Sequence, residues 1–161
     1  MIGKRICCAV DFSEPSWIAM EQAADLANRL HTELTLVHVV APSAPAGTDV
    51  ADVSRQLGDA DARQAEETLE VWRADAEQRA AVPVRARVLS GDPPLEIARF
   101  ADEEGYDLIV VGTHGRTGLS RLFLGSVAER VLRRAPVPVL VVRNHARMAR
   151  ERDAEEIAQY G

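Results

Sequence analysis

The chain has 161 residues, which fits one domain, and its hydrophobic content of 47% is enough to build a core. Its 25 acidic residues outnumber its 19 lysines and arginines, and the net charge of −6 argues against general nucleic-acid binding and against an anionic membrane surface as a partner. No apolar stretch approaches the roughly 20 residues that span a bilayer, and the start of the chain does not resemble a signal peptide, so a cytoplasmic protein is expected.

The first strand and the first helix are marked by a change in hydrophobic period. Residues 6–10 form an unbroken apolar run, which is typical of a strand buried on both faces. The run ends at Asp11, and Ser13 is placed to cap a helix that reaches about His31. The apolar face of that helix is expected to consist of Ala23, Leu26, Ala27 and Leu30.

Two neighbouring cysteines lie in the first strand. Cys7 and Cys8 point to opposite faces of a strand, so a disulfide between them would be strained. No histidine lies at the spacing of a zinc finger. Buried, reduced thiols are therefore predicted.

The alternation of strands and helices continues through the middle of the chain. Residues 33–40 predict a second strand, and residues 41–53 hold two prolines and a glycine that predict a loop. A long charged helix is expected over residues 54–80, with one apolar face made by Ala65, Leu69, Trp72 and Ala76. Residues 82–89 alternate Val84, Ala86 and Val88 with Arg85, Arg87 and Leu89. This alternation places the third strand at an edge of the sheet.

The last third of the chain adds two helices and two strands. A third helix opens at residues 91–94, and a fourth strand is expected over residues 107–111. The apolar face of the third helix is expected to consist of Pro94, Ile97, Ala98 and Ala101. The fourth helix is defined by the apolar positions Leu124, Val127, Ala128 and Val131. Two prolines precede the fifth strand, residues 139–142, and assign it to the other edge.

This order of elements predicts a single α/β domain. Long crossovers between successive strands imply a five-stranded parallel sheet with helices on both faces, and two edge strands give the order 3-2-1-4-5. The domain is expected to cover residues 1–143. Residues 144–161 are dense in charge and are expected to form a solvated tail, or alternatively a helix that binds a partner.

A glycine-rich segment follows the fourth strand. Residues 112–126 read GTHGRTGLSRLFLGS, so three glycines are spaced G-x2-G-x9-G with a serine directly after the last. Glycines let backbone N–H groups approach an anion, and a helix N-terminus adds partial positive charge. Residues 108–128 also contain no carboxylate in an otherwise acidic protein. The segment predicts a phosphate site, although glycines that serve only the geometry of a turn remain the alternative.

The predicted topology brings a carboxylate to the same place. Strands 1 and 4 are neighbours where the winding direction reverses, and ligands of open parallel sheets bind at that point. The residues just past their ends are Asp11 and Gly112. A carboxylate suits ribose hydroxyls or a base amine, so the pair indicates a nucleotide, with a plain turn or cap as the alternative for Asp11. The P-loop and dinucleotide fingerprints are both absent.

Five segments then stand in a characteristic order along the chain. They are V-D-F-S-x-x-S at residues 10–16, His38-Val39 ending the second strand, D-L-I-V-V-G at residues 107–112, the glycine loop with Gly125-Ser126, and P-V-P-V-L-V-V-R at residues 136–143. Together they resemble the universal stress protein family, ATP-binding type, over about residues 3–143. The resemblance implies the same sheet order and a homodimer in which the fifth strands of two subunits meet as antiparallel edges.

The resemblance also implies roles for particular residues. Asp11 would bind ribose or adenine, with Ala9 and Val10 beside the base, and Val39 would contact adenine through its backbone. The nucleoside end would be lined by Val111 and Gly112. The phosphates would be held by Gly115, Arg116, Gly125, Ser126 and Val127. Ser126 would act through its hydroxyl and the others mainly through backbone N–H groups, with ATP as the ligand and Mg²⁺ as its companion ion.

Three functions are compatible with these residues. The first is a regulatory protein of the stress response that binds ATP with little or no turnover. The second is an enzyme, such as a slow ATPase, a self-phosphorylating protein or an adenylyl transferase, for which His114 and Arg116 are the candidates near the γ-phosphate. The third is a holdase-like interaction protein with an incidental nucleotide. Binding is favoured because a positioned base and a second carboxylate for a metal are not evident.

Overall fold

Five strands alternate with four helices in the computed structural model, which describes residues 5–42, 51–113 and 124–143. The strands are β1 (Arg5–Ala9), β2 (Glu33–Val40), β3 (Val84–Ser90), β4 (Leu108–Gly112) and β5 (Val139–Val142). The helices are α1 (Glu14–Leu30), α2 (Ala51–Ala80), α3 (Pro93–Glu103) and α4 (Ser126–Arg134). None of the helices in these ranges is long and apolar enough to cross a membrane.

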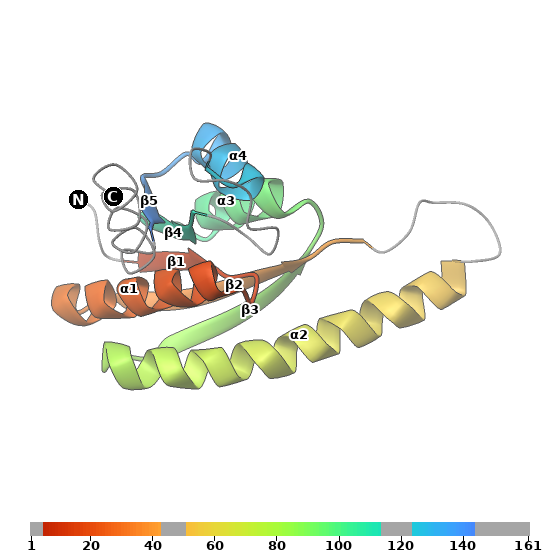
Figure 1. Ribbon diagram of the computed structural model, residues 1–161, viewed down its shortest axis with the longest axis horizontal. Helices are drawn as coiled ribbons and strands as arrows, with labels where there is room; N and C mark the ends of the chain where they lie inside the picture. The colour runs from red at the N-terminus through yellow and green to blue at the C-terminus, as the bar shows by residue number, and fades with distance from the viewer. Residues whose placement is uncertain (1–4, 43–50, 114–123, 144–161) are drawn as a thin grey trace, which may run out of the picture.

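The strands form one parallel sheet in the order β3-β2-β1-β4-β5, which confirms the predicted topology and both predicted edges. Figure 1 shows the sheet between two helical layers, with α1 and α2 on one face and α3 and α4 on the other. The amino-terminal part of the long helix α2 extends beyond the sheet, on the side where β2 ends. The molecule is therefore a three-layer α/β domain.

Alternate residues of each strand supply two separate hydrophobic cores. The core under α1 and α2 takes Ile6, Cys8, Leu34, Leu36 and Val110, and the core under α3 and α4 takes Cys7, Val37, Ile109 and Val111. Cys7 and Cys8 are both fully buried and unbridged, as predicted. Burial raises the pKa of the Cys7 thiol to about 12 and also raises that of Cys8, so neither thiol is a nucleophile at neutral pH.

Several element boundaries and faces differ from the sequence-based expectation. Helix α2 begins at Ala51, three residues inside the segment expected to be a loop. Helix α4 begins at Ser126, so Leu124 precedes it, and the side chain of Val127 is 40% exposed instead of buried. Leu30, the last residue of α1, is 45% exposed, although Ala27 in the same turn is fully buried. When the hydrophobic periodicity of a helix is continued up to or past its ends, residues there are wrongly assigned to the core.

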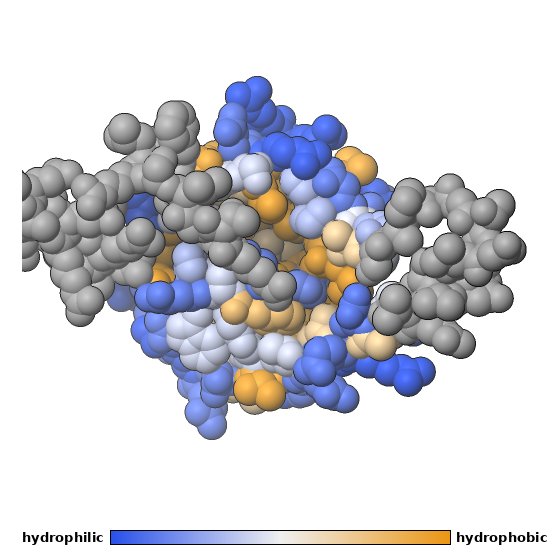
Figure 2. All heavy atoms as spheres, turned by 45° about the vertical axis from the view of Figure 1, so that its right-hand side comes forward, coloured by the Kyte–Doolittle hydropathy of each residue, from blue (hydrophilic) through white to orange (hydrophobic). Residues whose placement is uncertain are grey.

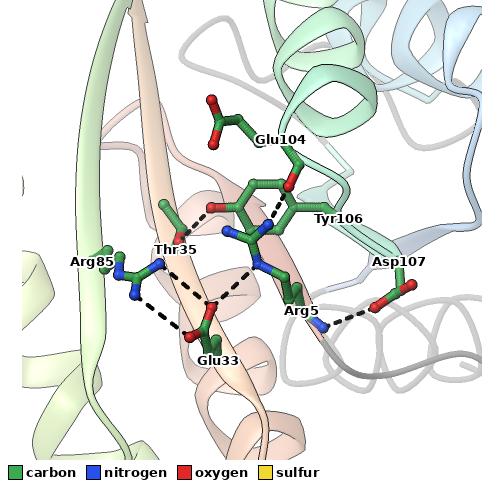
Figure 3. Close-up of polar contacts among 7 residues, drawn as sticks. All are labelled: Arg5, Glu33, Thr35, Arg85, Glu104, Tyr106 and Asp107. Atoms are coloured by element: carbon green, nitrogen blue, oxygen red, sulfur yellow. Dashed lines mark hydrogen bonds and ion pairs between the residues drawn. The ribbon is translucent and has the colours of Figure 1, made fainter.

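Polar side chains connect the strands at their amino-terminal ends (Figure 3). The Arg5 guanidinium bonds Glu33 at 3.2 Å and the Glu104 carbonyl, and its Cζ lies 4.6 Å from the centre of the Tyr106 ring. The Tyr106 hydroxyl donates to the buried Thr35 Oγ1 at 2.7 Å. The backbone N–H of Arg5 donates to Asp107 Oδ2 at 3.0 Å. These contacts join β1, β2 and the start of β4 at the end of the sheet remote from the carboxyl termini of the strands.

Replacing Tyr106 by Phe is expected to lower the free energy of unfolding by about 1–3 kcal/mol, because the buried Thr35 hydroxyl loses its donor. Thr32 provides the matched control, since its buried Oγ1 has no hydrogen-bond partner in the described part of the chain. Thr32→Val should therefore leave stability unchanged or raise it. Denaturant unfolding of both variants measures the difference, and equal losses would contradict the role given to the Tyr106 hydroxyl.

Candidate functional site

The carboxyl ends of β1 and β4 lie side by side at the centre of the sheet. The two strands pair in parallel, with Cys7 opposite Ile109 and Cys8 opposite Val110, so the residues that follow each strand leave the sheet together. The connection after β1 leads to one face of the sheet and the connection after β4 leads to the other, because α1 and α4 pack on opposite faces. Figure 2, which turns this end toward the viewer, shows a hollow between the helices with apolar residues inside it and polar residues at its rim. A ligand site is expected at such a point.

Three of the predicted site residues share the face that α3 and α4 cover. Ala9, Val39 and Val111 all pack with the core on that side, and Leu89 from the end of β3 joins them. They come from four neighbouring strands and lie near the carboxyl ends of those strands. Val111 is buried and the other three residues are partly buried, so together they form an apolar surface on that face of the sheet.

Val10 differs from these residues, because its side chain faces the opposite core. It is 5% exposed and packs under α1 and α2. Its backbone N–H donates to the Val37 carbonyl at 2.8 Å, and its own carbonyl lies 2.8 Å from His38 Nδ1. Val10 therefore supports the crevice from behind, and its side chain does not lie on the face that holds Ala9 and Val39.

Asp11 occupies the turn between β1 and α1. Its Oδ1 accepts hydrogen bonds from the Ser13 backbone N–H at 3.0 Å and from the Ser13 hydroxyl, and its own N–H donates to Ser16 Oγ at 3.2 Å. Ser13 in turn caps α1, as predicted, by accepting from the Ser16 N–H at 3.3 Å. One carboxylate oxygen thus has a structural task, which fixes where the side chain can point.

Gly112 ends β4 directly against the start of α1. A Cβ at this position would lie 2.7 Å from the Pro15 carbonyl oxygen and 2.9 Å from its carbon, closer than real Cβ contacts. Only a residue without a side chain allows this approach of two backbones. The glycine expected to serve a ligand is therefore required by the packing of β4 on α1.

The amino terminus of α4 lies beside the end of β4. The Gly125 N–H donates to the Thr113 carbonyl at 2.6 Å, and Thr113 itself donates to Val142 at 3.1 Å, so the helix start is held to both β4 and β5. Ser126 is the first residue of α4 and is exposed, and no side chain of the described residues caps this helix. Its first N–H groups and the positive end of its dipole are suited to an anion.

Two predicted phosphate ligands, Gly115 and Arg116, lie outside the described residues, as does His114. Among the residues that are described, no group of three or more histidine, cysteine, aspartate or glutamate side chains is arranged to hold a metal ion.

An ion pair near the crevice was not predicted from the sequence. Arg130, one turn into α4, bonds Asp92 at 2.7 and 3.3 Å, and Asp92 is the residue that precedes α3. The pair joins the amino-terminal ends of the two helices on one face of the sheet. An aspartate before a helix reads as a cap, so the sequence gives no signal that this one pairs with a later helix.

Comparison with known proteins identifies a family that matches most of the chain. The sequence pattern of the Universal stress protein family matches residues 3–143. The chain belongs to this family. A universal stress protein of Methanocaldococcus jannaschii is 36% identical over 140 residues, which cover 87% of this chain and 82% of that protein.

Solved structures of this family share the architecture. The universal stress protein UspA from Lactobacillus plantarum superposes with a TM-score of 0.81 at 28% identity, covering 89% of this chain and 99% of that one. A universal stress protein from Archaeoglobus fulgidus in complex with dAMP has a TM-score of 0.62 at 26% identity, covering 88% of this chain and 98% of that one. An adenine nucleotide is thus bound by a protein of this fold and family.

Gly112→Ala is expected to lower the free energy of unfolding by about 1–3 kcal/mol, since the new methyl group would overlap the Pro15 carbonyl and push α1 away from β4. Gly58→Ala is the matched control, because nothing lies within 4 Å of a Cβ at that position in helix α2. It should raise stability by about 0.5–1 kcal/mol through helix propensity. Thermal unfolding of the two variants checks the opposite signs, and a Gly112→Ala protein as stable as the wild type would refute the close-packing argument.

Proposed function

We propose that this protein binds ATP in the crevice between β1 and β4 and acts as a regulatory nucleotide-binding protein of the stress response, with little or no turnover. The observation that carries the proposal is the convergence of three unlike features at one place. An apolar surface (Ala9, Val39 and Val111), the Asp11 carboxylate and the amino terminus of α4, which no described side chain caps, lie at the same end of the sheet. Base, sugar and phosphate need these three environments in turn.

The nucleoside is assigned to the side of the crevice nearest β1 and β2. Adenine would lie against the apolar surface and take backbone contacts from Val39, while Asp11 would accept from ribose hydroxyls or the adenine amine. Val111 and Gly112 would line the same end. The complex of the Archaeoglobus fulgidus relative with dAMP supports an adenine nucleotide as the ligand class.

The phosphates are assigned to the amino terminus of α4. Gly125, Ser126 and Val127 would present backbone N–H groups, and the exposed Ser126 hydroxyl would add a donor. Gly115 and Arg116 would complete the cradle from the preceding segment, and Mg²⁺ would be held mainly by the phosphate oxygens. The exposure of Val127 suits a role for its backbone at the helix start.

Slow or absent turnover is part of this proposal. Asp11 accepts two hydrogen bonds from Ser13, which suits a carboxylate that holds a ligand in place. Efficient phosphoryl transfer needs strong charge stabilisation and a positioned base at the γ-phosphate. A regulatory role in which bound ATP alters the surface near α4 needs neither.

We also propose that two copies assemble through β5. At the other edge of the sheet, the start of β3 is capped by side chains of α2, because Glu77 accepts from the Val84 N–H at 3.0 Å and Arg73 donates to the Val84 carbonyl at 3.3 Å. At β5, the Pro138 and Val142 carbonyls bond β4, so the intervening Val139 and Val141 direct their backbone groups outward. Leu140 is also 40% exposed. An antiparallel pair of β5 strands would satisfy these groups.

The function is tested by what the purified protein retains and what it converts. Native protein should carry an adenine nucleotide that mass spectrometry identifies after denaturation, and the emptied protein should bind labelled ATP. Incubation over hours should release little ADP, because the crevice holds the nucleotide without activating it. Absence of ATP binding would overturn the proposal, and steady product formation would overturn the regulatory assignment in favour of an ATPase.

Two substitutions at Asp11 separate its ligand role from its turn role. Asp11→Asn keeps an oxygen for the Ser13 N–H but loses the charge, whereas Asp11→Ala loses both. Both should weaken ATP binding by about tenfold or more while leaving inorganic tripolyphosphate binding nearly unchanged. If Asp11→Asn binds ATP as the wild type does, the carboxylate serves the turn alone.

The dimer is tested with a proline at each edge. Val141→Pro removes an outward N–H from β5 and should yield monomers in analytical ultracentrifugation, since an antiparallel pair loses that donor. Ala86→Pro removes the corresponding outward N–H from β3, where the partner is not expected, and should leave the dimer intact. A monomeric wild type, or a dimer that survives Val141→Pro, would rule out the proposed interface.

A further inference from the structure

The turn that carries Asp11 is held by a side chain on the face that α1 and α2 cover. His38 lies one residue past the last β2 position paired with β1, and its side chain is on the side of α1 and α2. Its Nδ1 is 2.8 Å from the Val10 carbonyl oxygen. A carbonyl can only accept, so Nδ1 carries the proton and donates. The residue before Asp11 is thereby tied to β2 beyond the end of the ladder.

The residue after Asp11 is held by the same imidazole. Phe12 has a φ of 62°, a left-handed conformation that is unfavourable for a bulky side chain. Its ring stacks on His38, with centroids 4.3 Å apart and an angle of 27° between the planes. Its other neighbour is Trp72 of α2, which it meets edge-on at 5.4 Å. These ring contacts explain how an unfavourable backbone conformation persists at this position.

Both neighbours of Asp11 are therefore fixed by His38. Between these two held residues, Asp11 Oδ1 accepts hydrogen bonds from Ser13, so the direction of the carboxylate is set within the turn whose flanking residues His38 contacts. A change in the His38 contacts would rotate the turn and move the carboxylate without touching the crevice itself. The imidazole lies on the side of α1 and α2, whereas the apolar surface of Ala9, Val39 and Val111 lies on the side of α3 and α4.

We infer that His38 is a positioning residue for nucleoside recognition, acting on Asp11 through its hydrogen bond to Val10 and its stack with Phe12. The inference rests on the proposed ATP site, since it assigns the residue that sets the direction of the sugar- or base-binding carboxylate. It concerns the nucleoside alone. The proposed phosphate site at the start of α4 does not include the Asp11 turn, so phosphate binding should not change when His38 is replaced.

Three variants distinguish positioning from bulk packing. His38→Asn keeps an N–H donor close to the place of Nδ1, His38→Gln carries the same amide one bond further, and His38→Leu fills space without a donor. We expect Leu and Gln to weaken ATP binding about tenfold in calorimetry and Asn to restore most of it. Binding of inorganic tripolyphosphate should be nearly equal in all four proteins.

Amide hydrogen exchange in the nucleotide-free protein gives a readout that does not depend on ATP. The N–H groups of Asp11 and Ser13 should exchange about tenfold faster in His38→Leu and His38→Gln than in the wild type or His38→Asn, whereas that of Cys8 in the central strand should not change. A loss of protection throughout the sheet in His38→Leu would mark a general packing role and overturn the inference.

The outcomes separate this inference from the proposed function. If the wild type fails to bind ATP, the proposed function is wrong and nucleoside positioning is wrong with it, whatever the exchange data show. If the wild type binds ATP and all three variants bind it equally well, the site stands and the role of His38 is refuted. Equal losses in the Asn and Gln variants, or a parallel loss of tripolyphosphate binding, also refute it.

Discussion

The end of β4 meets the start of α1 with no side chain between them, and the geometry of the crevice depends on this contact. Because Gly112 allows the Pro15 backbone to come so close, the capped first turn of α1 lies directly beside the centre of the sheet. The Asp11 turn is part of the same connection, so it too is brought against the end of β4. Because Gly112 has no side chain, the turn that carries the Asp11 carboxylate can lie beside β4.

Successive residues of each strand point to opposite faces of the sheet, so the two faces have different roles. Residues of one parity (Ala9, Val39 and Val111) form the apolar surface of the crevice, while the adjacent Val10 and His38 support the chain from behind. Neighbouring residues in the sequence therefore have unlike tasks. The amino-terminal edge, with its Arg5 and Tyr106 contacts, stabilises the fold at a distance from the crevice.

Much of this arrangement could be predicted from the sequence, because buried parallel strands are unbroken apolar runs and edge strands are not. The sheet order and the pairing of β1 with β4 followed from that pattern. What could not be predicted depends on contacts between distant segments. The close approach at Gly112, the left-handed Phe12 and the pairing of Asp92 with Arg130 leave no periodic trace. Val127 was misplaced because α4 is short and its apolar spacing continues into the residues before it.

The placement of the aromatic side chains has an optical consequence. The chain contains two tryptophans, and both belong to one group, since Trp17 of α1 meets Trp72 of α2 edge-on at 4.8 Å and Trp72 meets Phe12. Tryptophan emission from this protein therefore originates in one place, beside the turn that carries the Asp11 carboxylate. A spectral change on adding a solute reports on the packing of α1 against α2 at that spot, without any attached dye.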